Sequence, residues 1–185
     1  FSIINGKPVL TEEEVNALDA NDIWKFDRRA TEQDASFRDQ AHQISDYALY
    51  TTIALPAFFA FDKKIRKDWL DLLVLYGEAH GINTYLYFIT AGSIDRIRPF
   101  VYNPDIELND KLESGTKLSF FSGHVSSAST STFFMAKVYS DYHPEIGNKK
   151  YWLYAAAIIP PAIVGYYRYR AMRHFPTDIM VGLSV

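Results

Sequence analysis

The sequence predicts an all-α protein built as a helical bundle. Three apolar stretches have the length of helices, namely residues 47–61, 69–91 and 151–167. A helix start is also encoded near the N-terminus, where Thr11 and Glu14 have the spacing of a capping box. In that motif the threonine side chain caps the first turn and the glutamate reaches back to the threonine N–H. Helices therefore account for the strongest patterns in the chain.

The N-terminal region, residues 1–45, is predicted to be amphipathic and to lie on the surface of a larger body. Residues 20–45 are polar and charged, with scattered apolar side chains that would anchor the segment. These anchors are Ile23, Trp24, Phe26, Phe37 and Ile44. A charged run, residues 62–68, separates the first two apolar stretches and indicates a loop or a membrane edge.

The apolar stretches fit either buried core helices or a membrane bundle. A spanning helix needs about 20 predominantly apolar residues, and charges or prolines such as Asp71, Glu78 and Pro160 interrupt these stretches. However, aromatic residues gather at their ends, as in the aromatic belts at membrane surfaces. They are Tyr47, Tyr50, Trp69, Tyr151, Trp152, Tyr166 and Tyr167.

Composition limits the class of protein. The 185 residues suit one domain, residues 1–185. A net charge of −3 argues against a nucleic-acid partner. The absence of cysteine excludes a thiol nucleophile and a thiolate metal site. Because the chain starts at Phe1 without a leader pattern, we expect any signal peptide to be removed or upstream. Residues 179–185 resemble the opening of a further helix, so we expect truncation at the C-terminus.

Three clusters, far apart in the chain, have the chemistry of an oxyanion pocket. Arginine offers permanently charged, planar donors that hold two phosphate oxygens at once. Histidine can act as a nucleophile or exchange a proton near neutral pH. A phosphate-transfer site is therefore the leading hypothesis. The clusters are Arg96 and Arg98 before Pro99; Ser122, Gly123 and His124; and Arg168, His174 and Asp178.

The second cluster is expected at the start of a helix, because small residues suited to close packing follow it. A helix start leaves N–H groups unpaired and carries a partial positive charge, so a phosphate could bind near Ser122. Gly123 would let the backbone approach the ligand, and His124 would face it. The alternative is a serine N-cap followed by a histidine with an ordinary structural partner.

In the third cluster, His174 precedes Asp178 by four residues, so the carboxylate is expected to reach the imidazole. Such a contact fixes the tautomer and makes the other ring nitrogen a better nucleophile. His174 is therefore the nucleophile candidate. The alternative is a pair that stabilises a helix start, beside a solvated or membrane-edge basic face of Arg168, Arg170 and Arg173.

Over residues 91–178 the clusters resemble the signature of the type 2 phosphatidic acid phosphatase superfamily, which includes bacterial non-specific acid phosphatases and vanadium haloperoxidases. That signature has a lysine, six residues, then Arg-Pro; later Pro-Ser-Gly-His; and last Ser-Arg, five residues, His, three residues, Asp. The three clusters fall in register with it. This chain departs at three positions, where Ala91 replaces the lysine, Phe121 the proline and Tyr167 the serine.

The resemblance implies a helical bundle of the phosphatidic acid phosphatase and haloperoxidase type, and metal-independent hydrolysis without a cofactor. His174 would attack phosphorus to give a phosphohistidine, Asp178 would orient it, and His124 would protonate the leaving group. The phosphate oxygens would be held by Arg98, Ser122, Gly123 and Arg168, with Arg96 a candidate to replace part of the lost lysine charge. The remaining histidines match nothing in the signature and are interpreted as surface or locally paired: His42, His80 and His143.

The resemblance also implies the substrate class, a phosphorylated lipid or a small phosphate ester. The apolar stretches favour lipid phosphates and a bacterial-type inner membrane, with the site facing the periplasm. The alternatives are a soluble periplasmic or secreted acid phosphatase, a vanadate-dependent haloperoxidase, and a catalytically silent lipid-binding protein. The sequence predicts no oligomeric state.

Overall fold

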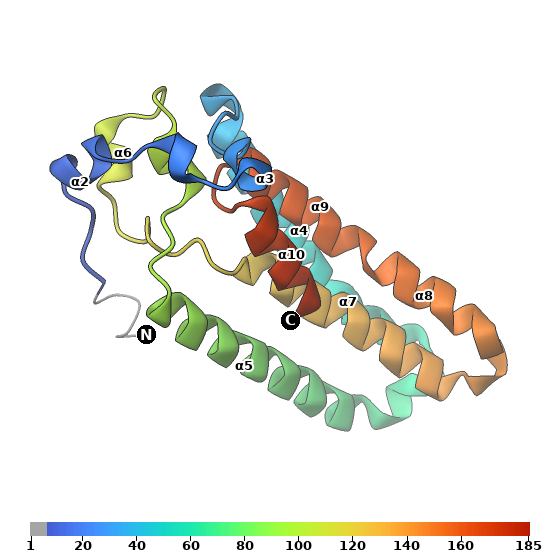
Figure 1. Cartoon of the computed structure of the whole chain (residues 1–185). Helices are drawn as coiled ribbons and strands as arrows, with labels where there is room; N and C mark the ends of the chain where they lie inside the picture. The colour runs from blue at the N-terminus through green and yellow to red at the C-terminus, as the bar shows by residue number, and fades with distance from the viewer. Residues whose placement is uncertain (1–6) are drawn as a thin grey trace.

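The computed structural model describes residues 7–185, and the regular structure in this range is helical (Figure 1). Within it the paired extended backbone is limited to one isolated parallel bridge, between Arg96 and Leu118. The predicted all-α class is confirmed. The first six residues of the predicted N-terminal region, 1–45, lie outside the described residues, as does the expectation drawn from Phe1.

The α-helices and 3-10 helices follow one another along the chain. The α-helices are α2 (Glu12–Asn16), α3 (Lys25–Arg28), α4 (Arg38–Ala54), α5 (Trp69–Ser93), α6 (Leu108–Lys111), α7 (Gly123–Tyr142), α8 (Lys150–Ala157), α9 (Ile159–Arg170) and α10 (Pro176–Ser184). The 3-10 helices are Ala20–Asp22, Ala35–Phe37, Leu55–Phe61, Ile65–Asp68, Pro99–Tyr102 and Pro144–Lys149.

Helix α7 is the centre of the bundle. It packs against α4, α5, α8, α9 and α10, and its small side chains allow these helices to approach closely. The buried apolar cluster between α4, α7 and α9 contains Leu49, Val125, Ala128 and Val164. This packing brings the beginning of α7, the end of α9 and the beginning of α10 to one end of the bundle (Figure 1).

Prolines shift two of the predicted helices. The first apolar stretch belongs to α4, which already begins at Arg38 and ends at Ala54, and Pro56 lies in the following 3-10 helix. The third stretch is divided into α8 and α9 just before Pro160 and Pro161. Proline has no N–H to continue a helical ladder and clashes with the preceding turn, which explains both breaks. The second stretch is α5, one uninterrupted helix as predicted.

A cap of short elements, residues 7–37 and 94–121, covers the end of the bundle where α7 begins (Figure 1). The predicted capping box is present at α2: Glu14 N–H donates to Thr11 Oγ1 at 3.2 Å, and Thr11 N–H donates to Glu14 Oε2 at 2.7 Å. The cap has its own apolar core, which also takes in a residue after α9: Leu10, Val15, Phe100, Val101, Ile106 and Met172.

The rest of the bundle has an apolar surface. On α5 only Asn83 and Ala91 are buried, and most of its large apolar side chains are exposed. On α8, Trp152 is 77% exposed. By length and composition, one helical stretch in the described chain, Ala35–Phe61, qualifies as a candidate membrane span, with 22% of its apolar window buried.

Candidate active site

The three clusters predicted from the sequence are joined in pairs by backbone hydrogen bonds. Ser119 N–H donates to the carbonyl of Arg96 at 3.0 Å, which links the segments before the first and second clusters. Phe100 N–H donates to Met172 at 3.1 Å, and Ser122 N–H donates to Asp178 at 3.1 Å. The third cluster is thereby attached to both of the others. The relative positions of the clusters thus rest on main-chain contacts rather than on long side chains alone.

The turn between α9 and α10 is a Schellman motif that holds the third cluster. Met172 has φ 52°, a left-handed conformation that residues other than glycine rarely adopt. Its N–H donates to Tyr169 at 2.9 Å, and the next N–H, of Arg173, donates to Arg168 at 3.1 Å. Arg168, Arg173 and His174 are consequently held around a single tight turn.

His174 is buried, and only one of its ring nitrogens is bound within the described chain. Its Nδ1 lies 2.7 Å from the carbonyl oxygen of Ser119. Because a carbonyl can only accept, Nδ1 must carry the hydrogen, and a neutral ring then has its lone pair on Nε2. Burial lowers the pKa of His174 well below its ordinary value, and the charges of Arg168 and Arg98 act in the same direction. The imidazole is therefore neutral at physiological pH, with Nε2 available as a nucleophile.

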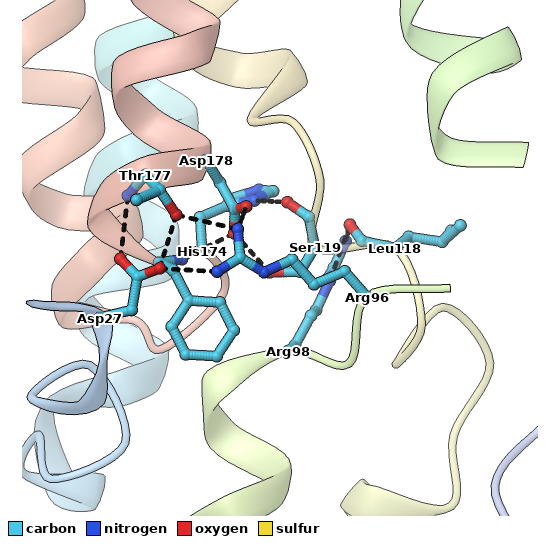
Figure 2. Close-up of polar contacts among 9 residues, drawn as sticks. Asp27, Arg96, Arg98, Leu118, Ser119, His174, Thr177 and Asp178 are labelled. Atoms are coloured by element: carbon cyan, nitrogen blue, oxygen red, sulfur yellow. Dashed lines mark hydrogen bonds and ion pairs between the residues drawn. The ribbon is translucent and has the colours of Figure 1, made fainter. Parts of the chain in front are cut away.

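The expected direct contact between Asp178 and His174 is replaced by a relay through Ser119 (Figure 2). Asp178 Oδ2 accepts from Ser119 Oγ at 2.6 Å and from Phe175 N–H at 2.8 Å, while Oδ1 pairs with Arg96. The prediction was wrong because four-residue spacing places Asp178 on the third residue of α10, where it caps its own helix start. Burial raises the pKa of Asp178 to about 6, and Arg96 opposes this.

Arg96 is occupied by carboxylates, contrary to the expectation that it binds phosphate. Its Nη2 donates to Asp27 at 2.7 Å, and its Nη1 pairs with Asp178 and donates to Thr177 Oγ1 at 2.9 Å. Its guanidinium carbon lies 4.5 Å from the centre of the Phe175 ring. Figure 2 shows the resulting network. Arg96 therefore joins the cap to α10, and Asp27 is a partner that the sequence did not predict.

Arg98 and Arg168 retain donors for a ligand. Arg98 makes two long hydrogen bonds, from Nε and Nη2 to the Leu118 carbonyl at 3.4 Å each. Arg168 donates from Nη1 to His42 Nδ1 at 2.8 Å, while its buried Nε has no partner within residues 7–185. Burial, and next the neighbouring Arg173, lower the pKa of Arg98 to about 10, so that it stays charged at neutral pH. Both arginines can bind an oxyanion.

Ser122 and Gly123 lie at the start of α7, as predicted. Ser122 occupies the N-cap position, but its hydroxyl makes no capping hydrogen bond. This buried oxygen has no partner elsewhere in the described chain. A Cβ on Gly123 would lie 3.1 Å from the ring of Tyr87, a tight contact that would oblige the ring to shift by a few tenths of an ångström. The free hydroxyl and the unpaired N–H groups of the first turn offer further donors to an anion.

His124 lies on the same turn and is held by α4. Its Nε2 is 2.9 Å from Asp46 Oδ1, a partner that the sequence analysis missed. His42, interpreted from sequence as a surface or locally paired residue, lies 3.8 Å from Asp46 one turn along α4, and it also accepts a hydrogen bond from Arg168. The signal that would have found these residues is a polar stripe at helical spacing along one face of α4. The stripe contains Arg38, His42, Ser45 and Asp46.

Two of the departures from the expected signature, Ala91 and Phe121, are apolar residues that supply no positive charge to the site. Ala91, at the lysine position, is fully buried in α5. Phe121 is also buried, and its ring centre lies 5.9 Å from that of Tyr87. Neither residue can donate a hydrogen bond from its side chain to an anion. The positive charge around His174 therefore comes from Arg98, Arg168 and their neighbours.

A neutral imidazole beside arginines with unpaired donors, at the start of a helix, has the chemistry that binding of a tetrahedral oxyanion requires. The chain belongs to the PAP2 superfamily, whose family profile matches residues 69–185. A similar solved structure is described as the first transmembrane PAP2 type phosphatidylglycerolphosphate phosphatase from Bacillus subtilis. The two share 23% sequence identity with a TM-score of 0.57, over 86% of this chain and 76% of that one. The comparison with curated protein sequences gave no match.

Proposed function

We propose that this protein is a metal-independent phosphatase that hydrolyses phosphate monoesters or diphosphates of lipids through a phosphohistidine on His174. The observation that carries the proposal is the tautomer of His174, whose Nδ1–H is bound to the Ser119 carbonyl. Nε2 is thereby left with its lone pair, next to arginines whose donors are not all used. Family membership supports phosphoryl transfer, and the similar solved structure is that of a phosphatidylglycerolphosphate phosphatase, whose substrate is a lipid phosphate.

In the first step, Nε2 of His174 attacks phosphorus and the bond from phosphorus to the ester oxygen breaks. The departing oxygen takes a proton from His124, which Asp46 holds in place. Burial, and next the charge of Arg168, lower the pKa of His124 to about 3. His124 must therefore take up this proton together with the anionic substrate, whose negative charge favours the protonated imidazole. The new phosphoimidazole carries positive charge, which the hydrogen bond from Nδ1 to Ser119 disperses. Asp178 acts on this step through Ser119 and is thus a positioning residue.

In the second step, water attacks the phosphohistidine while His124 accepts its proton. The bond from phosphorus to Nε2 then breaks, which releases phosphate and returns His174 to its neutral form. Arg98, Arg168, the Ser122 hydroxyl and the first N–H groups of α7 would bind the three equatorial oxygens. Fixed donors of this kind stabilise the charge that develops in the transition state. Arg96 has no part in phosphate binding in this mechanism, because carboxylates occupy it.

The exposed apolar surface supports a lipid substrate and a membrane. Large apolar side chains of α5 and α8 are exposed away from the cap, including Leu73, Val74 and Trp152. Exposed apolar area of this extent is typical of a surface that meets another apolar phase. The loop at the far end from the site carries Lys63, Lys64, Arg66 and Lys67. By the positive-inside rule this loop is cytoplasmic, which directs the site towards the periplasm of a bacterial-type inner membrane.

The test is phosphate release between pH 5 and 8, with EDTA present, from a short-chain phosphatidate and from p-nitrophenyl phosphate. Wild type is compared with His174→Ala, whose helical content is checked by circular dichroism. We expect wild type to hydrolyse the lipid and His174→Ala to be inactive, since no other group replaces Nε2. Equal turnover by both proteins would refute the assignment of His174.

The choice of substrates separates the remaining functions. Release from p-nitrophenyl phosphate alone would indicate a soluble type of acid phosphatase rather than a lipid phosphatase. No release from either substrate by a folded wild type would contradict the proposed activity and favour a silent lipid-binding protein. Halide oxidation by peroxide, observed only after vanadate is added, would indicate a haloperoxidase.

A further inference from the structure

We propose that Arg173 is an additional phosphate-binding residue, which supplies the cationic contact that Ala91 cannot make. The inference rests on the proposed function and extends it to a residue outside the three predicted clusters. The sequence analysis placed Arg173 in a solvated basic face as the alternative to a functional role. In the structure it lies instead beside the nucleophile and is largely enclosed by the cap.

The backbone directs Arg173 to the site. Its N–H donates to the carbonyl of Arg168, as the last hydrogen bond of the Schellman motif, and the next residue is His174. Its guanidinium carbon lies 5.4 Å from the centre of the Phe100 ring, and Phe100 follows Pro99 of the first cluster. Arg173 therefore bridges from the turn of the third cluster to the segment that follows the first. It is also near enough to Arg98 and Arg168 for its charge to lower the pKa of both.

The guanidinium of Arg173 lacks the partners that neighbouring arginines have. Arg96 is bound by Asp27 and Asp178. Arg38, whose guanidinium carbon lies 4.7 Å from the same Phe100 ring, pairs with Asp110. For Arg173 the structure of residues 7–185 contains no side-chain hydrogen bond or ion pair. Its Nε is buried and unsatisfied, as are those of Arg38 and Arg170, so Arg173 differs from them in that its terminal nitrogens also have no partner.

The surrounding charges are dominated by other cations. Burial, and next Arg38, lower the pKa of Arg173, while Glu113, Asp39 and Asp46 act on it in the opposite direction without bonding to it. The charge of Arg173 in turn lowers the pKa of Arg98 and of Arg168. Of the three guanidinium groups of Arg98, Arg168 and Arg173, the described chain gives an ion pair only to Arg168, with Asp46 at 3.5 Å. The single carboxylate does not balance three cations, and the remaining repulsion is relieved when a doubly charged anion binds among them. A phosphate monoester is such an anion.

The experiment measures binding of inorganic phosphate and of orthovanadate, a mimic of the transferred phosphoryl group, to the full chain. The variants are Arg173→Met, which keeps the apolar stem on Phe100, and Arg173→Lys, which keeps the charge. The matched control is Arg170→Met, because Arg170 is the last residue of α9 and has partners of its own: it donates to Tyr166 and lies over Phe37. Thermal unfolding verifies that each variant is folded.

We expect Arg173→Met to weaken binding of both anions about tenfold to a hundredfold, as for the loss of a charged hydrogen bond. Arg173→Lys should recover part of this loss, and Arg170→Met should stay within about twofold of wild type. The same order is expected in kcat/KM for the lipid substrate. Wild-type affinity in folded Arg173→Met would overturn the inference. If the wild type binds the anions but does not turn over, the proposed function fails while the role of Arg173 is still decided by the binding data.

Discussion

The two sides of His174 differ in how their charges are paired. On the side of Asp178, each carboxylate has its cation: Arg96 joins Asp27 to Asp178, and Ser119 connects this network to the ring. On the other side, Arg168 lies 3.5 Å from Asp46 through Nη1, but its Nε has no partner in the described chain, and Arg98 makes only long hydrogen bonds. The paired side positions the imidazole, whereas the unpaired side has donors with which it could bind an anion.

Neighbouring arginines in one site can thus have opposite roles. Arg96 and Arg98 are two residues apart, but their side chains have different partners: Arg96 reaches two carboxylates, whereas Arg98 donates to the carbonyl of Leu118 (Figure 2). Of the two, Arg96 is the one that meets buried carboxylates. A change on the paired side should therefore alter folding first, and a change on the unpaired side should alter anion binding and turnover first.

Among changes that compare the two sides, the largest effect is expected for Arg168→Met on the unpaired side. Removal of a donor that stabilises transition-state charge lowers kcat by about 10²-fold to 10³-fold in enzymes of known mechanism. We expect a loss of this size in kcat for the lipid substrate, measured at saturating substrate. Arg170→Met, two residues further along the same helix, removes the same charge from outside the site and is the control. A loss of equal size in both variants would mean that net charge, rather than the site, is responsible.

On the paired side, Arg96→Met should act mainly on stability. Asp27 and Asp178 are both buried, and loss of their cation leaves two enclosed carboxylates without an ion-pair partner. Breaking a buried pair in this way costs about 3–5 kcal/mol of the free energy of unfolding. Denaturant unfolding of the two proteins measures the difference. A change below about 1 kcal/mol, the size expected of a surface ion pair, would contradict the structural role of Arg96.

On the paired side, protonation of Asp178 should also determine how kcat/KM falls at acidic pH. Burial raises the pKa of Asp178 to about 6, so its carboxylate is present above this pH and is protonated below it. Protonation removes the ion pair with Arg96, and we expect kcat/KM to fall as the pH decreases through 6. His174, whose pKa is lowered, stays neutral over this range.

Asp178→Asn provides the control for this limb. The variant should have strongly reduced activity. Its plot of kcat/KM against pH should retain only the limb due to the second ionisation of the substrate phosphate, at about pH 6. A profile of unchanged shape in the variant would assign the limb to the substrate alone. Rates from pH 5 to 8 are needed for both proteins.

Much of the fold follows from the sequence because its signals are local. The capping box at Thr11 and the uninterrupted helix from Trp69 are confirmed, and so is the superfamily that the clusters predicted. The partners within the site do not follow, because they depend on contacts between distant segments. Asp46 and Asp27 are ordinary acidic residues in the sequence, and only tertiary packing brings them to His124 and Arg96.

The contact from His174 to Asp178 through Ser119 also could not be predicted from local sequence patterns. The four-residue spacing is compatible with a direct contact, but the choice depends on where Ser119 lies. Ser119 is placed by the pairing of its backbone with Arg96, which no local pattern encodes. The roles of the site residues stay predictions, as does the single domain predicted for residues 1–185.

The most direct test of the proposed chemistry is to trap the covalent intermediate. In His124→Gln the group that would activate water is missing, while p-nitrophenyl phosphate needs little protonation of its leaving group. Rapid acid-free quenching followed by mass spectrometry of the digested protein should then locate one phosphoryl group on His174, bound through Nε2. A burst of p-nitrophenol with no phosphoryl group on His174, or with one on another residue, would contradict the mechanism.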